Sequence, residues 1–374
     1  MTDTEYIKIG RFTAAALKSG ISGENLPEKP ADISWGQVYS FSKSHSLSNM
    51  VFSSYESEIK KDAPEELVQL WERETHVLFA KHTTQKNEFS RVTSEFTKQG
   101  IDFLPLKGFL MKALYPRPEF RTMSDLDFLI REGDIERAGE TVKSMGYKGV
   151  SEDEDNVHDT FQKPPFMDIE LHRKLFADSE YSFDDAILKE GESHWYLMTD
   201  EDFLCFILRH SKKHYENGGC GMRAVLDHYL LLKKYPKVFL SPEFEERLRK
   251  AGLYDFNNLI SSLAFLWFEG IEPEGDISGF EVYTLTGGTY GTYANAALTG
   301  MKKKGKLGYV LERVFPSPSL IKKRYKWVRK CPILLPVGYV VRIFSSIIFG
   351  DALAYIRAIK QGKKRMNDEN QKAE

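Results

Sequence analysis

The chain has 374 residues, of which 41% are hydrophobic and 28% charged, a composition that is typical of folded globular proteins and excludes a largely disordered one. Its formal net charge of −2 conceals an asymmetry, because residues 302–365 carry seventeen Lys or Arg against two acids. Such a basic segment can dock on the acidic remainder of the chain, attract a polyanion or lie on an anionic membrane surface.

The first hundred residues have a helical pattern. It is clearest from Pro64 to Gln99, where apolar residues recur at helical spacing among Glu and Lys, and Gly100 follows as a stop. Pro64 lies near the expected first turn, where its missing N–H leaves no hydrogen bond unmade. Residues 1–99 are therefore predicted to form an N-terminal helical region.

Residues 100–198 instead alternate between short strands and helices, as in an α/β core. An acidic stretch at 151–159 is expected to be a mobile loop within this core. The expected strands are 101–106, 126–130 and 166–172, and the expected helices are 109–115 and 134–145.

Helical patterns return after residue 198 and predict two further regions, a helical domain at 199–301 and a basic helical segment with its tail at 302–374. The apolar run 333–349 contains Pro336, Gly338 and Arg342. We therefore expect a buried or docking helix there, with an interfacial helix as the alternative and no transmembrane span. The remaining helices are expected at 202–215, 222–234, 242–251 and 257–268, and a loop at 286–293.

Three scattered cysteines and the N-terminal residues bear on location. The cysteines are odd in number and lack Cys-x-x-Cys spacing, which argues against a disulfide framework and a cysteine zinc site. The first residues lack the basic and apolar regions of a signal peptide. We expect a cytoplasmic protein, with peripheral association at the membrane surface as the alternative that the basic segment leaves open.

The strongest chemical signal is the pair Asp125 and Asp127. Residues two apart on a strand project to the same face, so these carboxylates point together while Leu126 and Phe128 pack on the other side. Like charges held this close repel each other, and a divalent cation is the usual compensation. An isolated Asp-x-Asp pair also caps turns in many proteins, so the metal site depends on further residues.

A third carboxylate is expected from the strand at 166–172, whose alternation places Asp168, Glu170 and His172 on one face. If this strand pairs with the first, three carboxylates meet at one point. Such a set suits two Mg²⁺ (or Mn²⁺) ions, which bind a triphosphate and activate a hydroxyl. Asp168 and Glu170 compete for the third position.

Upstream, Lys107 and Gly108 lie where a strand ends and a helix begins. Glycine permits close backbone approach, and a helix N-terminus offers free N–H groups to phosphate. Lys107 would add a point charge, and Arg121 a planar guanidinium, for the same anion. These residues predict a triphosphate-binding site next to the carboxylates.

This arrangement resembles the uncharacterised nucleotidyltransferase family of the DNA polymerase β superfamily, over about residues 60 to 350. The resemblance implies a polymerase β-type α+β or α/β core, a small mixed sheet with flanking helices, between N- and C-terminal helical regions. It also implies that Asp125, Asp127 and Glu170 are the catalytic and metal-binding residues. The acid two residues before His172 fits the family pattern, which favours Glu170 over Asp168. The matching residues are Lys107, Gly108, Tyr115, Pro116, Arg121, Asp125, Asp127, Glu170 and His172.

Later helices extend the resemblance, because His210 and His214 fit a His-x3-His pattern that a later Asp follows. The two histidines, one turn apart, can line a pocket, bind metal or simply pack, and Arg223 and Asp227 can pair on one helix face. One position departs from the wider superfamily, whose Gly-Ser is Gly108-Phe109 here. Further candidates for the pocket are Asp168, His172, His210, His214, Arg223 and Asp227.

The sequence thus predicts a metal-dependent nucleotidyltransferase. It would move a nucleoside monophosphate from an NTP, expected to be ATP, to an acceptor hydroxyl or phosphate with release of pyrophosphate. The acceptor, whether a small molecule, a protein or an RNA, is left open. Two alternatives are a nucleotide-binding or regulatory protein of the same fold, for which the missing serine argues, and an adaptor that binds a polyanion or a membrane surface through the basic segment.

Overall fold

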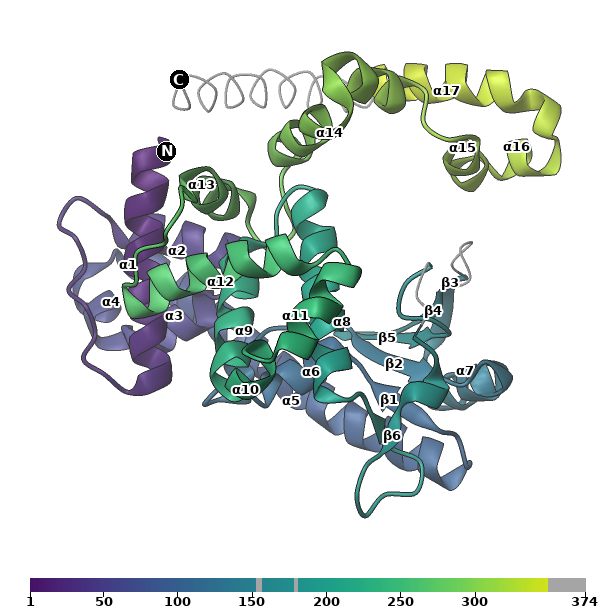
Figure 1. The fold of residues 1–374 in the computed structure, drawn as a ribbon, viewed down its shortest axis with the longest axis horizontal. Coiled ribbons are helices and arrows are strands. Elements are labelled where there is room, and N and C mark those ends of the chain that lie inside the picture. Colours follow the sequence, from purple (N-terminus) through teal and green to yellow (C-terminus); the bar gives the residue numbers. More distant parts are fainter. Residues whose placement is uncertain (153–156, 178–180, 349–374) are drawn as a thin grey trace. The chain divides into compact units, whose positions relative to one another are not determined.

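The computed structural model describes residues 1–152, 157–177 and 181–348 (Figure 1). The chain divides into two compact units, one made of Met1–His210 with Arg223–Gly275 and the other of Ser211–Met222 with Asp276–Glu374. The first unit holds a mixed sheet with flanking helices, so the predicted fold class is confirmed. The four-region division predicted from the sequence stays a prediction.

Helices α1 to α5 precede the sheet. In α1 the side chains of Thr2 and Glu5 each accept a hydrogen bond from the other's backbone N–H, and the helix ends at Gly23 with a φ of 74°. The long helix predicted from Pro64 to Gln99 is confirmed as α5, one residue shorter at each end. The bounds are α1 (Asp3–Ser22), α2 (Trp35–Ser44), α3 (Ser48–Ser54), α4 (Glu56–Asp62) and α5 (Glu65–Lys98).

The sheet has the strand order β1-β2-β5-β4-β3. Strand β2 pairs antiparallel with β1 and parallel with β5, whereas β4 pairs antiparallel with both β5 and β3. The bounds are β1 (Phe103–Pro105), α6 (Lys107–Lys112), η1 (Pro118–Phe120), β2 (Leu126–Ile130), η2 (Glu132–Asp134), α7 (Ile135–Ser144), β3 (Lys148–Glu152), β4 (His158–Lys163) and β5 (Met167–His172).

One face of the sheet is covered by α5 and α7, which lie beside it in Figure 1. Phe128 of β2 and Leu171 of β5 are completely buried there, together with Phe96 of α5 and Val142 of α7. Successive side chains of a strand point to opposite faces, so this packing turns the polar residues of β2 and β5 to the other face. The hydrophobic core therefore fixes which way the predicted site residues project.

Three strands of the sheet were predicted from the sequence, and two, β3 and β4, were not. The strand predicted at 126–130 is confirmed residue for residue, and the strands at 101–106 and 166–172 are confirmed but shorter. The mobile loop expected at 151–159 is wrong where it overlaps β3 and β4, and residues 153–156 lie outside the described part. These strands are polar in sequence, and their hydrogen bonds come from pairing in the sheet: β4 pairs with β5, and β3 pairs with β4.

The helices after the sheet agree with the predicted positions to within three residues. A small second sheet, β6 with β7, precedes them. The described cysteines are all free, as expected from their spacing. The bounds are η3 (Phe183–Asp185), β6 (Ile187–Leu188), β7 (Tyr196–Leu197), α8 (Asp200–Glu216), α9 (Gly221–Lys234), α10 (Pro236–Phe239), α11 (Pro242–Lys250) and α12 (Tyr254–Glu269).

We expect His228 of α9 to make the stability of the first unit sensitive to acid. Its side chain is 2% exposed, its Nε2 lies 2.8 Å from Ser261 Oγ, and burial lowers its pKa to about 3. The unfolded chain takes up a proton below about pH 6.5 that the folded chain does not, so stability falls as pH drops from there. Between pH 7 and 5 this one group should cost about 2 kcal/mol. Urea unfolding should show that His228→Gln reduces this loss, and an unchanged pH dependence would contradict it.

Within the second unit, its two chain segments meet at a close backbone approach. Gly221, with a φ of 64°, lies so near Gly288 that a Cβ would be 2.7 Å from the Gly288 carbonyl carbon. The loop predicted at 286–293 is confirmed but shorter, because α13 extends to Gly287 and α14 begins at Tyr293. Its helices are α13 (Ser278–Gly287), α14 (Tyr293–Val314), α15 (Pro318–Arg324), α16 (Lys326–Lys330), η4 (Pro332–Leu334) and α17 (Leu335–Ile348).

Helix α14 is bent at Gly305, whose φ of 69° and ψ of 164° are not helical. Beyond the bend, the ring of Tyr309 lies against Gly300, where a Cβ would be only 2.3 Å from the ring. Tyr309 is buried with Ala297 and Met301 in a small core of this unit. Glycine at residues 300 and 305 thus lets the two halves of α14 fold onto each other.

The helix expected within 333–349 is α17, while residue 349 lies outside the described part. The prediction that this helix is buried is wrong for one face of α17, where Val337, Val340 and Phe344 are exposed. The pattern of apolar residues did not reveal which face packs, since both faces carry them. Within the described residues, no helix has the length and hydropathy needed to cross a membrane.

Candidate active site

The two aspartates lie at the start of β2, on the face away from the core. Leu126 and Phe128 are buried against α5, so Asp125 and Asp127 project to the opposite face, as the alternation predicted. The preceding loop is held by α5, where the side-chain amide of Gln85 donates to the Met123 carbonyl at 3.1 Å. The position of Asp125 is thus fixed by helix contacts on the chain just before it.

Glu170 reaches the same point from the neighbouring strand. Strands β2 and β5 run parallel, and Asp127 and Glu170 are direct partners in the register. Carboxylate oxygens of Asp125, Asp127 and Glu170 all lie within 4.8 Å of one another. The strand pairing on which the sequence prediction depended is therefore present, and it brings three carboxylates together.

Lys107, the first residue of α6, places its ammonium among these carboxylates. Its Nζ is 3.1 Å from Asp127 Oδ1. Burial alone would lower the pKa of Lys107, but the charges of Asp127, Asp125 and Glu170 outweigh it and raise the pKa. The carboxylate cluster therefore stabilises the positive charge of Lys107, as a site that binds cations would.

Asp127 carries the second observation that fits a metal ion. Its side chain is only 1% exposed, and its Oδ2 has no hydrogen-bond partner among the described residues. A buried carboxylate oxygen without a partner is costly, and a divalent cation would satisfy it. Burial, followed by repulsion from Asp127, raises the pKa of Asp125, which a cation would reverse.

Histidines border the carboxylates. The Nε2 of His172 lies 3.1 Å from Asp127 Oδ1 and 3.3 Å from Glu170 Oε2. Burial opposes its protonation, but these contacts with Asp127 and Glu170 raise its pKa to about 8. Burial likewise opposes ionisation of Glu170, and the hydrogen bond with His172 outweighs it and lowers the Glu170 pKa. His172 thus contacts both carboxylates and helps to hold Asp127 and Glu170 in position.

His158 is a site residue that the sequence analysis missed. It faces His172 across β4 and β5, with ring centroids 4.9 Å apart, and its Nε2 is 3.8 Å from Glu170 Oε1. His158, Glu170 and His172 form a second group whose ligand atoms could hold a metal ion. The only sequence signal was the polar alternation of β4, which the neighbouring acidic stretch obscured.

Arg121 lies beneath α6 in a buried ion pair. Its Nε and Nη2 donate to the two carboxylate oxygens of Asp227 at 2.9 and 2.8 Å, and its Nη1 donates to the Gly108 carbonyl at 3.3 Å. The hydroxyl of Tyr115 donates to Asp227 as well, at 2.8 Å. A Cβ on Gly108 would be 3.2 Å from the sulfur of Met123. Packing against this network is therefore one reason for glycine here.

The remaining candidates lie around this core of the site. Asp227 is paired with Arg121. The Nη1 of Arg223 donates to the carbonyl and the hydroxyl of Thr122 at 3.2 and 3.0 Å. Asp168 shares the β5 face with Glu170, opposite Gln162 in the register. Among the described residues, neither group that could hold a metal includes Asp168, His210 or His214.

Comparisons with known proteins give a family match. A family model described as an uncharacterised nucleotidyltransferase matches residues 31–269. No curated protein sequence matches the chain. A solved structure of the antibiotic-resistance factor ANT(2'')-Ia aligns with a TM-score of 0.36 and 12% sequence identity, covering 47% of this chain and 95% of that chain.

Proposed function

This chain belongs to the uncharacterised nucleotidyltransferase family and is a nucleotidyltransferase, and on that premise we propose how its site works. It transfers a nucleoside monophosphate from an NTP, taken to be ATP, to an acceptor hydroxyl or phosphate, and releases pyrophosphate. Asp125, Asp127 and Glu170 would hold the divalent cation, Mg²⁺ or Mn²⁺. The reaction takes place in the cytoplasm, where NTPs are available.

The geometry of the three carboxylates supports this proposal. Three carboxylates from two paired strands converge within 4.8 Å, and the buried Oδ2 of Asp127 has no partner among the described residues. A structural cluster of acids would be expected to use all of its oxygens in hydrogen bonds. An acidic cluster that binds Lys107 and leaves one oxygen unpaired suits divalent cations and the phosphates they accompany.

The chemistry is in-line displacement at the α-phosphorus. The acceptor oxygen forms a bond to phosphorus, the bond from phosphorus to the bridging oxygen of the β-phosphate breaks, and pyrophosphate leaves with that electron pair. When bound, the divalent ions neutralise charge on the phosphates and lower the pKa of the attacking hydroxyl. Glu170, ionised because its pKa is lowered, accepts the acceptor's proton. His172 orients Glu170 and Asp127 by contacting both.

Lys107 and its neighbours contribute to nucleotide binding. The Lys107 ammonium, 3.1 Å from Asp127 Oδ1, would pair with a triphosphate bound at these carboxylates. The guanidinium of Arg121 is engaged by Asp227 and the Gly108 carbonyl. We assign Arg121 an indirect part in nucleotide binding, since it holds Gly108 and the start of α6 in place below Lys107.

Label transfer from an α-phosphate-labelled NTP tests the reaction and its metal requirement. The full chain is incubated with Mg²⁺ or Mn²⁺ and a cell extract that supplies acceptors, and labelled products are separated by size and charge. Transfer should require the divalent cation, stop with excess EDTA and return when the cation is restored in excess. Transfer that persists in EDTA would contradict the proposed metal site, because the three carboxylates would then have no ion to hold.

The non-catalytic alternative is less well supported. It rested on Phe109, which follows Gly108 where the superfamily has serine. Phe109 stacks on Phe89 with ring centroids 3.5 Å apart and so packs against the core. The carboxylates are all present despite this change. The acceptor is to be identified from the labelled product of the extract experiment.

A further inference from the structure

Helix α17 of the second unit is held by one face. Gly338 is buried, and a Cβ there would be 2.7 Å from Ile321 of α15 and 3.0 Å from Val328 of α16. On the same side, the Tyr339 hydroxyl donates to the Pro316 carbonyl at 2.6 Å. Close packing through a glycine leaves little freedom to rotate the helix, so its outer face is fixed as well.

That outer face carries a continuous apolar stripe. Val337, Val340, Val341 and Phe344 are spaced at i, i+3, i+4 and i+7, and they are 48%, 51%, 39% and 61% exposed. Ile333, in the turn before α17, is 87% exposed. Single exposed apolar residues are ordinary, but a stripe over two helical turns indicates a surface that another apolar phase covers.

The part of the chain around this stripe is strongly basic. Residues 302–348 contain twelve Lys or Arg and one acid, Glu312, a net charge of +11. Exposed cations follow one another along α15 and α16, including Arg324, Lys326 and Lys330. An apolar helix face within a basic unit is the pattern of helices that lie at the surface of anionic membranes.

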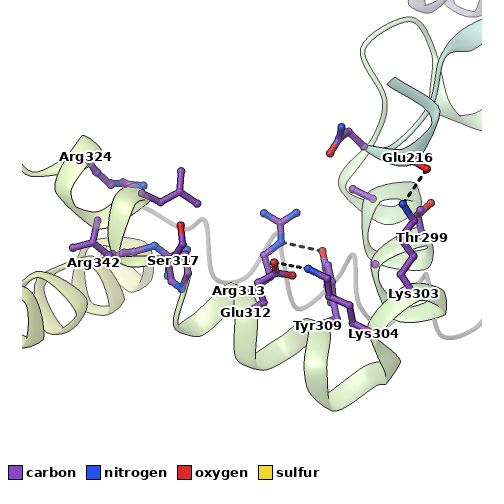
Figure 2. A pocket seen from close by; sticks show the side chains of 16 residues that line it. Glu216, Thr299, Lys303, Lys304, Tyr309, Glu312, Arg313, Ser317, Arg324 and Arg342 are labelled. Carbon is purple, nitrogen blue, oxygen red and sulfur yellow. Dashed lines mark hydrogen bonds and ion pairs between the residues drawn. The ribbon is translucent and has the colours of Figure 1, made fainter. Parts of the chain in front are cut away.

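A basic cavity lies in the same unit. It has a volume of about 700 Å³, and Figure 2 shows Arg324 and Arg342 together at one end with Ser317. Its two lysines are paired with acids, Lys303 with Glu216 at 3.0 Å and Lys304 with Glu312 at 2.5 Å. The arginines therefore give the cavity its excess positive charge, which suits a phosphate group.

We propose that the second unit docks on an anionic phospholipid surface, with the α17 stripe (Val337, Val340, Val341 and Phe344) inserted at the interface. Cations of α15 and α16 and the arginines of the cavity bind lipid phosphates. A second copy of this chain fits less well, because two copies of segment 302–348, each with a net charge of +11, would repel each other. RNA fits less well because the stripe is mainly aliphatic and offers little to stack on bases. The proposal is independent of nucleotidyl transfer.

Co-sedimentation of the full chain with vesicles tests it. Binding should be strong to phosphatidylcholine vesicles that contain phosphatidylglycerol, weak to phosphatidylcholine alone, and reduced by added salt. The double variant Val340→Asn/Phe344→Ser should lose at least about tenfold in binding to the anionic vesicles. Arg324→Gln and Lys326→Gln should each lose about fivefold. All these side chains are exposed, so circular dichroism should report a folded chain.

Leu240→Asn is the matched control, because Leu240 is apolar and 84% exposed but belongs to the first unit. It should bind vesicles like the parent chain. Full binding by Val340→Asn/Phe344→Ser, or equal binding to neutral vesicles, would overturn the proposal. So would complete competition by soluble glycerol phosphate, which would assign the cavity to a free anion. Self-association in ultracentrifugation that the double variant abolishes would assign the stripe to a second copy.

Discussion

Asp127→Asn is expected to lower nucleotidyl transfer by about 10³-fold or more while the chain stays folded. Asp127 is the central carboxylate, because it partners Glu170 in the register and contacts Lys107 and His172. The amide cannot replace a charged metal ligand. Loss of several kcal/mol of charge stabilisation in the transition state corresponds to this factor. The measurement is label transfer from an α-phosphate-labelled NTP.

The same substitution should separate metal binding from folding. In the parent chain three carboxylates face Lys107 and a protonated His172, which leaves one excess negative charge without a cation. Asp127→Asn removes that excess, and the amide oxygen can still accept hydrogen bonds. We therefore expect little change in the melting temperature without metal. Mn²⁺ should raise the melting temperature of the parent chain but not that of the variant.

Asp168→Asn is the control for this prediction, because Asp168 lies on the same face of β5 but outside the carboxylate group. It should keep both the transfer activity and the stabilisation by Mn²⁺. Transfer that survives in Asp127→Asn would show that the reaction does not use this site. Loss of the folded state in Asp127→Asn would instead make the carboxylate structural.

The parts of this site that could be predicted from the sequence are those that depend on contacts local in the chain. Alternation along single strands correctly placed Asp125, Asp127 and Glu170 on faces away from the core, since a strand's side-chain period is a local property. The meeting of these faces depends on β2 pairing in parallel with β5, between residues more than forty positions apart. The sequence could state that pairing only as a condition.

The residues that the sequence missed or left open share one cause. His158 joins the site through β4, a polar strand whose hydrogen-bond partners are distant in the chain. The sequence allowed Asp227 to pair with Arg223 at helical spacing, but the structure pairs it with Arg121, 106 positions away. Likewise the exposed face of α17 follows from where Gly338 packs. Long-range contacts of this kind leave no periodic signal in a single sequence.

Asp227→Ala is expected to destabilise the first unit by about 3–5 kcal/mol. Arg121 is 9% exposed, and two of its nitrogens donate to Asp227. Without the carboxylate, a guanidinium is left buried and unpaired, and the Tyr115 hydroxyl loses its acceptor. The cost of an unpaired buried charge exceeds what the intact pair contributes. Urea unfolding of the parent chain and the variant measures the difference.

The double variant Arg121→Met/Asp227→Leu decides what Arg121 does. Because it removes both charges and keeps apolar volume, it should recover much of the stability that Asp227→Ala loses. If Arg121 acts only by keeping the region around Gly108 and α6 packed, apolar side chains of similar volume can take over that part, and the recovered protein should bind NTP with a KM within a few-fold of the parent chain. A KM raised by about tenfold or more, at recovered stability, would mean that the guanidinium itself contacts the triphosphate. Failure to recover stability would show that packing around Tyr115 and Gly108 requires the ion pair, which would make the network a scaffold for the active site.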